Sequence, residues 1–232
     1  MKNSSIEWTD HTFNPWMGCT KVSPGCDHCY AEALSKRAPK TIGQWGAGAP
    51  RRRTSPAYWK QPLRWDAESF VACSKCGWRG GVLSLGPATQ PQACPTCGSR
   101  VGDGVAIARR RVFCASLADW LDNEAPIEWL VDLLDLIRRT PNLDWLLLSK
   151  RIGNWRNRVI DAGTHAASIP NLYLSAWLRK WFAGIEVPSN IWIGATICNQ
   201  AEADRDIPKL LATPAAKRFL SIEPMLGPVD LR

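Results

Sequence analysis

Hydrophobic and polar positions follow two different spacings along the second half of the chain. Between residues 126 and 139, apolar side chains such as Leu130 and Leu134 recur three or four positions apart, which is the spacing of one helix face. Residues 143–148 instead form a short apolar run without alternation, which is typical of a strand buried on both faces of a sheet. The pattern therefore predicts a helix followed by a buried strand.

Strands and helices are predicted to alternate along most of the chain, which favours a parallel α/β fold with five strands. Residues 39–66 show little periodicity and are rich in Pro, Gly, Arg and Trp, so we expect an extended loop there with one short helix at most. The other expected strands are 111–117, 191–197, 217–222 and a short first strand that runs into Cys19; the other expected helices are 30–37, 152–162, 171–183 and 200–211, the last broken at Pro208.

Four cysteines in the middle of the chain form two C-x2-C pairs, Cys73 with Cys76 and Cys94 with Cys97, and a glycine follows each pair. This spacing is typical of a zinc ribbon, in which four thiolates close the coordination shell of a structural zinc ion. We expect the ribbon to be an insert in the α/β core. The resulting division is 1–67 for the N-terminal part of the core, 68–108 for the zinc-ribbon insert and 109–232 for the remainder of the core.

Three further cysteines, Cys19, Cys26 and Cys29, are spaced C-x6-C-x2-C near the N-terminus. Three thiolates on a short loop can hold three irons of a 4Fe–4S cluster and leave the fourth iron without a protein ligand. A closed zinc site would need a fourth ligand, from His11, His28 or a distant residue. The spacing favours the iron–sulfur cluster, and zinc stays as the alternative.

The cysteine loop belongs to a wider set of motifs: SIEWTD at 5–10, NP at 14–15, GCTKVSPGC at 18–26, CYAE at 29–32, SKR at 149–151, WIG at 192–194 and FLSIEPMLGP at 219–228. Together these motifs resemble a phage-associated family of unknown function that is regarded as related to the radical S-adenosylmethionine (radical SAM) enzymes. The resemblance covers most of the chain except the ribbon. The usual superfamily spacing is C-x3-C-x2-C, so the first interval is longer here.

The resemblance implies an incomplete (β/α)6-type barrel, since no sixth strand follows residues 217–222. An open barrel edge would need cover, from another chain or from the N-terminal segment. It also implies a 4Fe–4S cluster whose open iron binds S-adenosylmethionine (SAM). One electron would then cleave the sulfonium and give a 5′-deoxyadenosyl radical that abstracts hydrogen from a substrate.

Polar residues follow the apolar strand runs, and the carboxyl ends of parallel strands are where α/β proteins gather their functional groups. A salt bridge at the rim or a helix cap is the alternative for each of these residues. The residues expected to hydrogen-bond SAM are Ser116, Asp119, Thr196 and Asn199. The residues expected to act in catalysis are Lys150, Arg151 and Glu223, with the two cations meeting a carboxylate or a phosphate.

The chain carries a formal charge of +8, concentrated at 51–53, 109–111 and 150–151. Such an excess favours a polyanionic partner, here a nucleic acid or a nucleotide as substrate. Lys75, Arg79 and Arg100 of the ribbon could add nucleic-acid contacts. The alternative function is a non-catalytic iron–sulfur and zinc module that binds nucleic acid or a partner protein. The tryptophans that could stack on bases or pack around the cofactor loop are Trp8, Trp16, Trp45, Trp59 and Trp65.

The location of the protein is expected to be cytoplasmic. No apolar run approaches the roughly 18 residues of a membrane span, and the N-terminus has no signal-peptide core. Seven of the nine cysteines fall into the two metal-ligand groups, which indicates a reducing compartment rather than a disulfide framework. The sequence therefore predicts a protein without a membrane partner.

Overall fold

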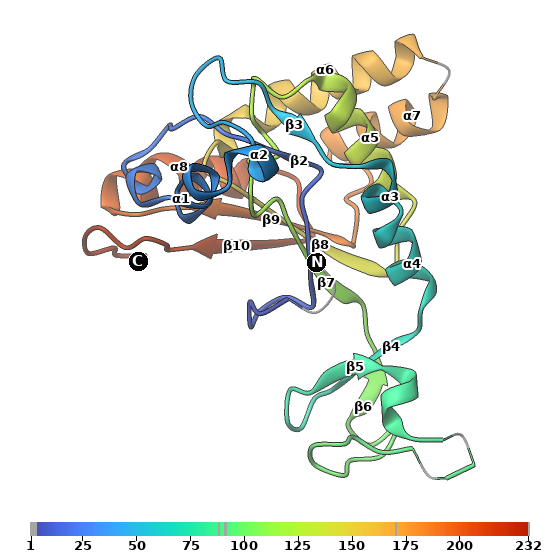
Figure 1. Ribbon diagram of the computed structural model, residues 1–232. Helices are drawn as coiled ribbons and strands as arrows, with labels where there is room; N and C mark the ends of the chain where they lie inside the picture. The colour runs from blue at the N-terminus through green and yellow to red at the C-terminus, as the bar shows by residue number, and fades with distance from the viewer. Residues whose placement is uncertain (1–3, 88, 91, 170, 232) are drawn as a thin grey trace.

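A five-stranded parallel sheet forms the centre of the computed structural model, which describes residues 4–87, 89–90, 92–169 and 171–231. The sheet order follows the chain: β1 (His11–Phe13), β7 (Arg110–Cys114), β8 (Leu143–Ser149), β9 (Ile191–Thr196) and β10 (Lys217–Ser221). The α/β class and the five strands are confirmed. The sheet does not close into a barrel, because β1 and β10 are its two edges within the described residues (Figure 1).

The helices that connect the later strands agree with the periodicity. They are α5 (Ile127–Arg138), α6 (Trp155–Ser168), α7 (Leu172–Phe182) and α8 (Gln200–Ala212). The predicted break at Pro208 is wrong, since α8 continues through it. Pro208 cannot bond to the carbonyl of Asp204, but both residues are exposed, so water can reach that carbonyl.

The first strand is shorter than predicted. β1 ends at Phe13, and Asn14 and Pro15 separate it from β2 (Trp16–Met17). β2 leaves the main sheet and pairs antiparallel with β3 (Arg52–Arg53). The expectation that a strand of the main sheet runs into Cys19 is therefore wrong, because the Asn-Pro turn redirects the chain.

Residues 39–66 are more regular than the expected extended loop. They contain α2 (Pro39–Ile42), α3 (Pro56–Trp59) and the start of α4 (Gln61–Ala67). Each of these helices has a proline in its first turn, where the missing N–H costs nothing. Helices this short show no usable hydrophobic period, which is why the pattern did not predict them.

The main hydrophobic core packs large aromatic side chains between the sheet and the helices. Trp16, Trp120, Trp145 and Trp181 are fully buried, and Trp65 is 4% exposed. Trp16 and Trp65 are therefore core residues and cannot stack on bases.

The four-cysteine insert forms a small separate sheet below the main one (Figure 1). Its strands are β4 (Phe70–Cys73), β5 (Arg79–Gly81) and β6 (Val105–Ile107), with a 3-10 turn η2 (Val82–Leu85). It has its own core of Val71, Leu85 and Val105 beside two of the cysteines. The insert thus packs separately from the main core.

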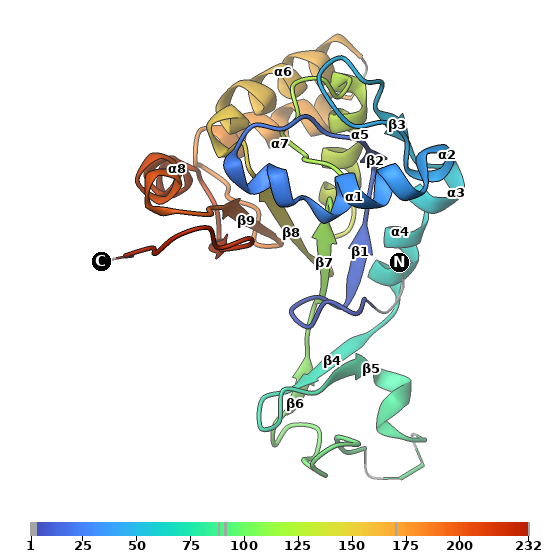
Figure 2. The same cartoon turned by 60° about the vertical axis from the view of Figure 1, so that its left-hand side comes forward.

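The edge formed by the carboxyl ends of the strands carries the cysteine loop. Strand register keeps these ends level, because Phe13 pairs with Cys114, and Ser149 pairs with Ala195. The loop contains a 3-10 turn η1 (Pro24–His28) and leads into α1 (Tyr30–Arg37), at the predicted position. In Figure 2, α1 lies across the upper ends of β1 and β7, so the loop and the strand ends face one another.

Candidate metal and cofactor sites

The ribbon cysteines converge on one point. The four sulfur atoms lie within 4.8 Å of one another, with Cys73 and Cys94 buried and Cys76 and Cys97 exposed. The amides of the two following glycines donate to the carbonyls of Cys73 and Cys94 at 2.9 Å, which turns each C-x2-C pair into a tight knuckle. The four thiols could therefore hold a metal ion such as zinc.

Two basic residues of the ribbon are already paired. Lys75 contacts Asp103 at 3.0 Å within the ribbon. Arg79 binds Asp10 at 2.9 Å and so ties the ribbon to the core. Arg100 is exposed. The ribbon thus offers nucleic acid fewer free cations than its composition suggests.

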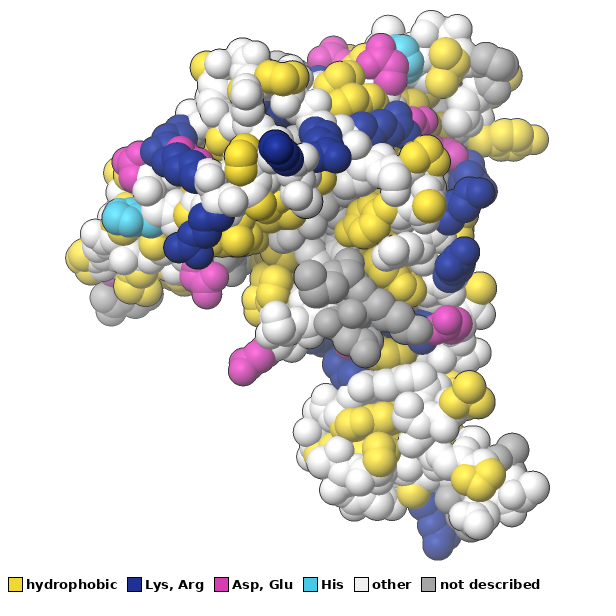
Figure 3. All heavy atoms as spheres, in the orientation of Figure 1, with side chains coloured by type: hydrophobic (Ala, Val, Ile, Leu, Met, Phe, Trp, Pro, Cys, Tyr) yellow, Lys and Arg dark blue, Asp and Glu magenta, His cyan; other side chains and the backbone are white. Residues whose placement is uncertain are grey.

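Several of the basic residues are buried in the core, where they bind protein groups. Arg51 is buried and its Nε donates to Asp122 at 2.6 Å. Arg110 is 6% exposed and donates to the carbonyls of Trp65 and Glu68 at 2.6 Å. On the face shown in Figure 3, most Lys and Arg side chains lie on the α/β core above the ribbon.

A membrane-spanning helix must be both long and apolar, and none of the helices in the described part of the chain meets these two conditions.

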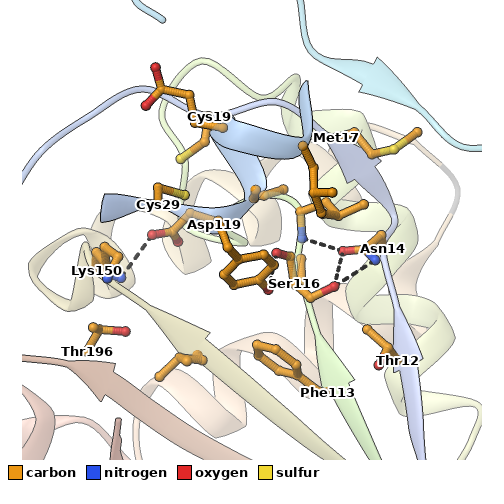
Figure 4. A pocket seen from close by; sticks show the side chains of 18 of the residues that line it. Thr12, Asn14, Met17, Cys19, Cys29, Phe113, Ser116, Asp119, Lys150 and Thr196 are labelled. Carbon is orange, nitrogen blue, oxygen red and sulfur yellow. Dashed lines mark hydrogen bonds between the residues drawn. The ribbon is translucent and has the colours of Figure 1, made fainter. Parts of the chain in front are cut away.

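The second site is a pocket of about 1120 Å³ at the carboxyl ends of the strands. Cys19, Cys26 and Cys29 all line it, and Figure 4 shows the side chains of Cys19 and Cys29 at its upper end. Cofactor pockets commonly measure about 300–1,000 Å³, so this one has room for more than one small ligand.

The three pocket thiols do not converge on a single ion as the ribbon thiols do. Among the described residues, the ribbon cysteines are the only such group whose ligand atoms meet at an ion-sized site. His11, one candidate for a fourth zinc ligand, stacks on Trp65 at 4.3 Å and does not line the pocket. His28 does line it.

Most predicted site residues lie in the same pocket. Those that line it are Ser116, Asp119, Lys150, Arg151, Thr196 and Glu223. Asn199 does not; its Oδ1 accepts from the amide of Glu202 at 3.0 Å and caps α8. Cys198 is fully buried behind the loop and also lies outside the pocket lining. The structure thus brings six of the predicted residues together in one pocket, whereas Asn199 caps a helix.

Asp119 uses its carboxylate to hold the strand ends together. Oδ1 accepts from the Ser149 hydroxyl at 2.7 Å and the Leu121 amide at 2.9 Å. Oδ2 accepts from the Lys150 amide at 3.0 Å and pairs with Arg151 at 3.2 Å (Figure 4). At 4% exposure, this carboxylate has its hydrogen-bonding capacity largely filled by protein groups.

Arg151 is similarly engaged. Its Nη1 donates to the sulfur of Cys19 at 3.2 Å, and its Nη2 donates to the Thr20 carbonyl at 2.5 Å. Burial raises the pKa of Cys19 to about 12, with Asp119 acting in the same direction and Arg151 opposing both. The free thiol therefore stays protonated at neutral pH, and a metal must displace that proton to bind there.

Asn14 is a pocket residue that the sequence pattern did not single out beyond its turn with Pro15. Its Nδ2 donates to the Ser116 hydroxyl at 3.0 Å, and its Oδ1 accepts from the Leu117 amide at 2.7 Å (Figure 4). The Tyr30 hydroxyl donates to the Ser116 carbonyl at 2.6 Å. These contacts join β1, the loop after β7 and α1 around the pocket. A polar residue directly after a strand, as Asn14 is after β1, was the available signal.

Lys150 and Glu223 have no ion-pair partner among the described residues, although both line the pocket. The Lys150 ammonium lies near Gly25 of the cysteine loop. Trp8 packs on Phe113 with ring centroids 4.8 Å apart, and both residues line the pocket. The pocket therefore combines three thiols, a free cation, a free carboxylate and an aromatic wall.

The model of one protein family, described as "Protein of unknown function (DUF5131)", matches residues 3–232. No curated protein and no solved structure matches the chain.

Proposed function

The chain belongs to this family of proteins of unknown function, and we propose that its pocket binds a 4Fe–4S cluster together with SAM, as in a radical SAM enzyme. The observation that carries the proposal is that all three loop cysteines and six predicted site residues line one pocket at the carboxyl ends of parallel strands. When bound, such a cluster with SAM supplies one-electron cleavage of the sulfonium bond. The protein contributes binding, orientation and exclusion of water.

The donor set fits the cluster better than a lone ion. Thiolates are the soft ligands that iron–sulfur clusters use, and three of them leave one iron open. A four-iron cluster spaces its cysteines more widely than a single ion does, which agrees with sulfur atoms that share a pocket without meeting at one point. The pocket is also larger than a cluster alone requires.

The charges of Lys150 and Glu223 are opposite to those of the carboxylate and the ammonium in the amino acid part of SAM. Lys150 could pair with a carboxylate and Glu223 with an ammonium, since neither has an ion-pair partner in the described part of the chain. The Thr196 and Ser116 hydroxyls add hydrogen-bonding groups on the same rim. We assign these four residues to SAM and substrate binding, and Arg151 and Asp119 to holding the site together.

For the substrate class we propose a nucleotide or nucleic acid. The support is a second cation on the pocket wall, Arg52, whose guanidinium donates to the carbonyls of Lys40 and Thr41 at 2.6 Å and has no carboxylate partner among the described residues. Together with Lys150 it gives the pocket a net attraction for phosphate.

For the ribbon we propose a structural zinc ion, because four thiolates leave no open coordination position. A ribbon that forms a separate sheet below the main one also suits a second candidate function, a non-catalytic module that binds nucleic acid or a partner protein (Figure 1). A cytoplasmic setting, which would keep all these thiols reduced, stays a prediction.

Anaerobic reconstitution with iron and sulfide, followed by electron paramagnetic resonance (EPR) of the reduced protein with and without SAM, tests the proposal. We expect a 4Fe–4S signal that changes when SAM is added and is lost in Cys26→Ala. The matched control is Cys114→Ala, which removes a buried cysteine of β7 outside the pocket lining. Zinc alone, with no iron uptake, would leave the binding module as the function.

A further inference from the structure

The Arg151 guanidinium lies directly against the first cysteine of the loop. Its Nη1 donates to the Cys19 sulfur at 3.2 Å, and its Nη2 to the carbonyl of the next residue, Thr20, at 2.5 Å. The Arg151 side chain is only 7% exposed. A hydrogen bond from a charged donor is stronger than one from a neutral donor, and burial of the guanidinium strengthens it further.

A buried network of charges holds the guanidinium in this position. Arg151 pairs with Asp119 at 3.2 Å and lies 3.9 Å from Asp122. Asp122 in turn accepts from Arg51 at 2.6 Å, and Arg51 donates to the Thr20 hydroxyl at 2.7 Å. Two arginines therefore hold the Cys19 sulfur and the carbonyl and hydroxyl of Thr20.

The other two loop cysteines lack an equivalent donor. Cys26 has a longer contact of 3.8 Å with the hydroxyl of Ser23. No side-chain hydrogen bond to the Cys29 sulfur is present in the described part of the chain. Cys19 is therefore set apart from the other two by a positively charged donor.

We infer that Arg151 is a positioning residue that holds Cys19 as a cluster ligand and raises the reduction potential of the cluster through its N–H···S hydrogen bond. The inference rests on the proposed function. A reduced cluster carries one more negative charge than the oxidised one, and a cationic donor on a ligand sulfur stabilises that charge. Arg151 thus serves electron uptake, and Lys150 is left to meet anions.

A redox titration of the reconstituted protein, followed by EPR, tests this assignment. In Arg151→Met we expect the equilibrium constant for one-electron reduction to fall roughly tenfold, which is about 59 mV toward more negative potential. Arg151→Lys keeps the charge and should shift the potential less. The matched control is Arg110→Met, a buried arginine that donates to the Trp65 carbonyl at 2.6 Å and does not line the pocket; it should titrate like the parent protein.

A second variant protects the test from misfolding, because Arg151→Met leaves Asp119 buried without its cation. The double variant Asp119→Asn with Arg151→Met removes both charges of the pair, so their effects on the potential largely cancel. The loss of the N–H···S bond is then the main remaining difference from the parent protein. We expect its potential still to lie below that of the parent. A double variant that binds the cluster and titrates at the parent potential would overturn the inference while the proposed function stands. A parent protein that takes up no cluster would overturn both.

Discussion

The ribbon and the pocket use cysteine in opposite ways. In the ribbon, four thiols meet within 4.8 Å, and the supporting hydrogen bonds come from amides four residues away in the chain. In the pocket, three thiols face a large cavity, and the support comes from Asp119 and Arg151, about 90 to 130 residues further along. A closed ligand set suits structure, whereas an open set with distant support suits chemistry.

This difference also decides how each region should respond to damage. The ribbon has a small core of its own and, with the zinc ion that we propose, would depend on that metal to fold. The pocket is built on the main core and depends on buried charge pairs. The two regions should therefore fail separately and through different causes.

Removal of the ribbon metal should have the largest effect. Structural zinc typically supplies roughly 10–16 kcal/mol of binding free energy that is also folding free energy, so the metal-free ribbon should unfold. We expect a chelator, or Cys94→Ala, to abolish hydrogen-exchange protection in β4–β6 and to leave β8 protected. The matched control is Cys29→Ala, which should keep both the zinc and the ribbon. Simultaneous loss of protection in β8 would show that the two regions are one cooperative unit.

Loss of a buried charge should be the main hazard for the pocket. Asp122→Ala removes the buried carboxylate that pairs with Arg51 at 2.6 Å and leaves Arg51 the more exposed Glu124 at 3.3 Å, so we expect a cost of about 3 kcal/mol in the free energy of unfolding. Asp132→Ala breaks the exposed pair with Arg53 and should cost under about 1 kcal/mol. Urea unfolding of the zinc-loaded protein measures both. Equal midpoints for the two variants would contradict the role of the buried network.

Thiol reactivity should distinguish the folded pocket from the unfolded chain. Burial raises the pKa of Cys19 to about 12, whereas a free cysteine has a pKa near 8.5. At pH 8 the thiolate fraction should be on the order of a thousandfold lower in the folded, cluster-free protein, and the alkylation rate should be lower as a result, although by a smaller factor because a thiolate of higher pKa is more nucleophilic. The rate should keep rising with pH up to about 12. Mass spectrometry of Cys19 after iodoacetamide treatment measures it, and a rate in the folded state equal to that in urea would refute the prediction.

The sequence predicted what depends on local spacing. The C-x2-C pairs placed the ribbon ligands, and the helical period placed α5 and α7 to within a residue or two. The short helices between residues 39 and 66 escaped because they have too few residues to show a period. The predicted helix break at Pro208 is wrong because the tolerance of a helix for proline depends partly on whether the freed carbonyl is exposed to water. That exposure is not visible in the sequence.

Apart from the cysteine loop, the sequence predicted only those polar pocket residues that lie at or just after the ends of the expected strands. The rule that parallel strands end at one edge predicted that Ser116, Lys150 and Thr196 lie near one another, and all three line the pocket. It could not show that Arg151 would turn to Cys19, since that contact joins residues 132 positions apart. Nor could it show that Asn199 would cap its own helix, because a cap and a rim ligand have the same sequence signal.

The ion pair between Arg79 of the ribbon and Asp10 of the core should have the smallest effect. Arg79 and Asp10 are 2.9 Å apart with side chains 21% and 15% exposed, and Asp10 also accepts from the Arg111 amide at 2.7 Å. A double-mutant cycle of Arg79→Ala and Asp10→Ala removes the Arg111 contribution, and we expect a coupling energy of about 1 kcal/mol. The readout is the thermal unfolding of the zinc-loaded ribbon. A coupling near zero would mean that the ribbon is positioned by its strands alone, and one of several kcal/mol would mean that ribbon and pocket are not independent.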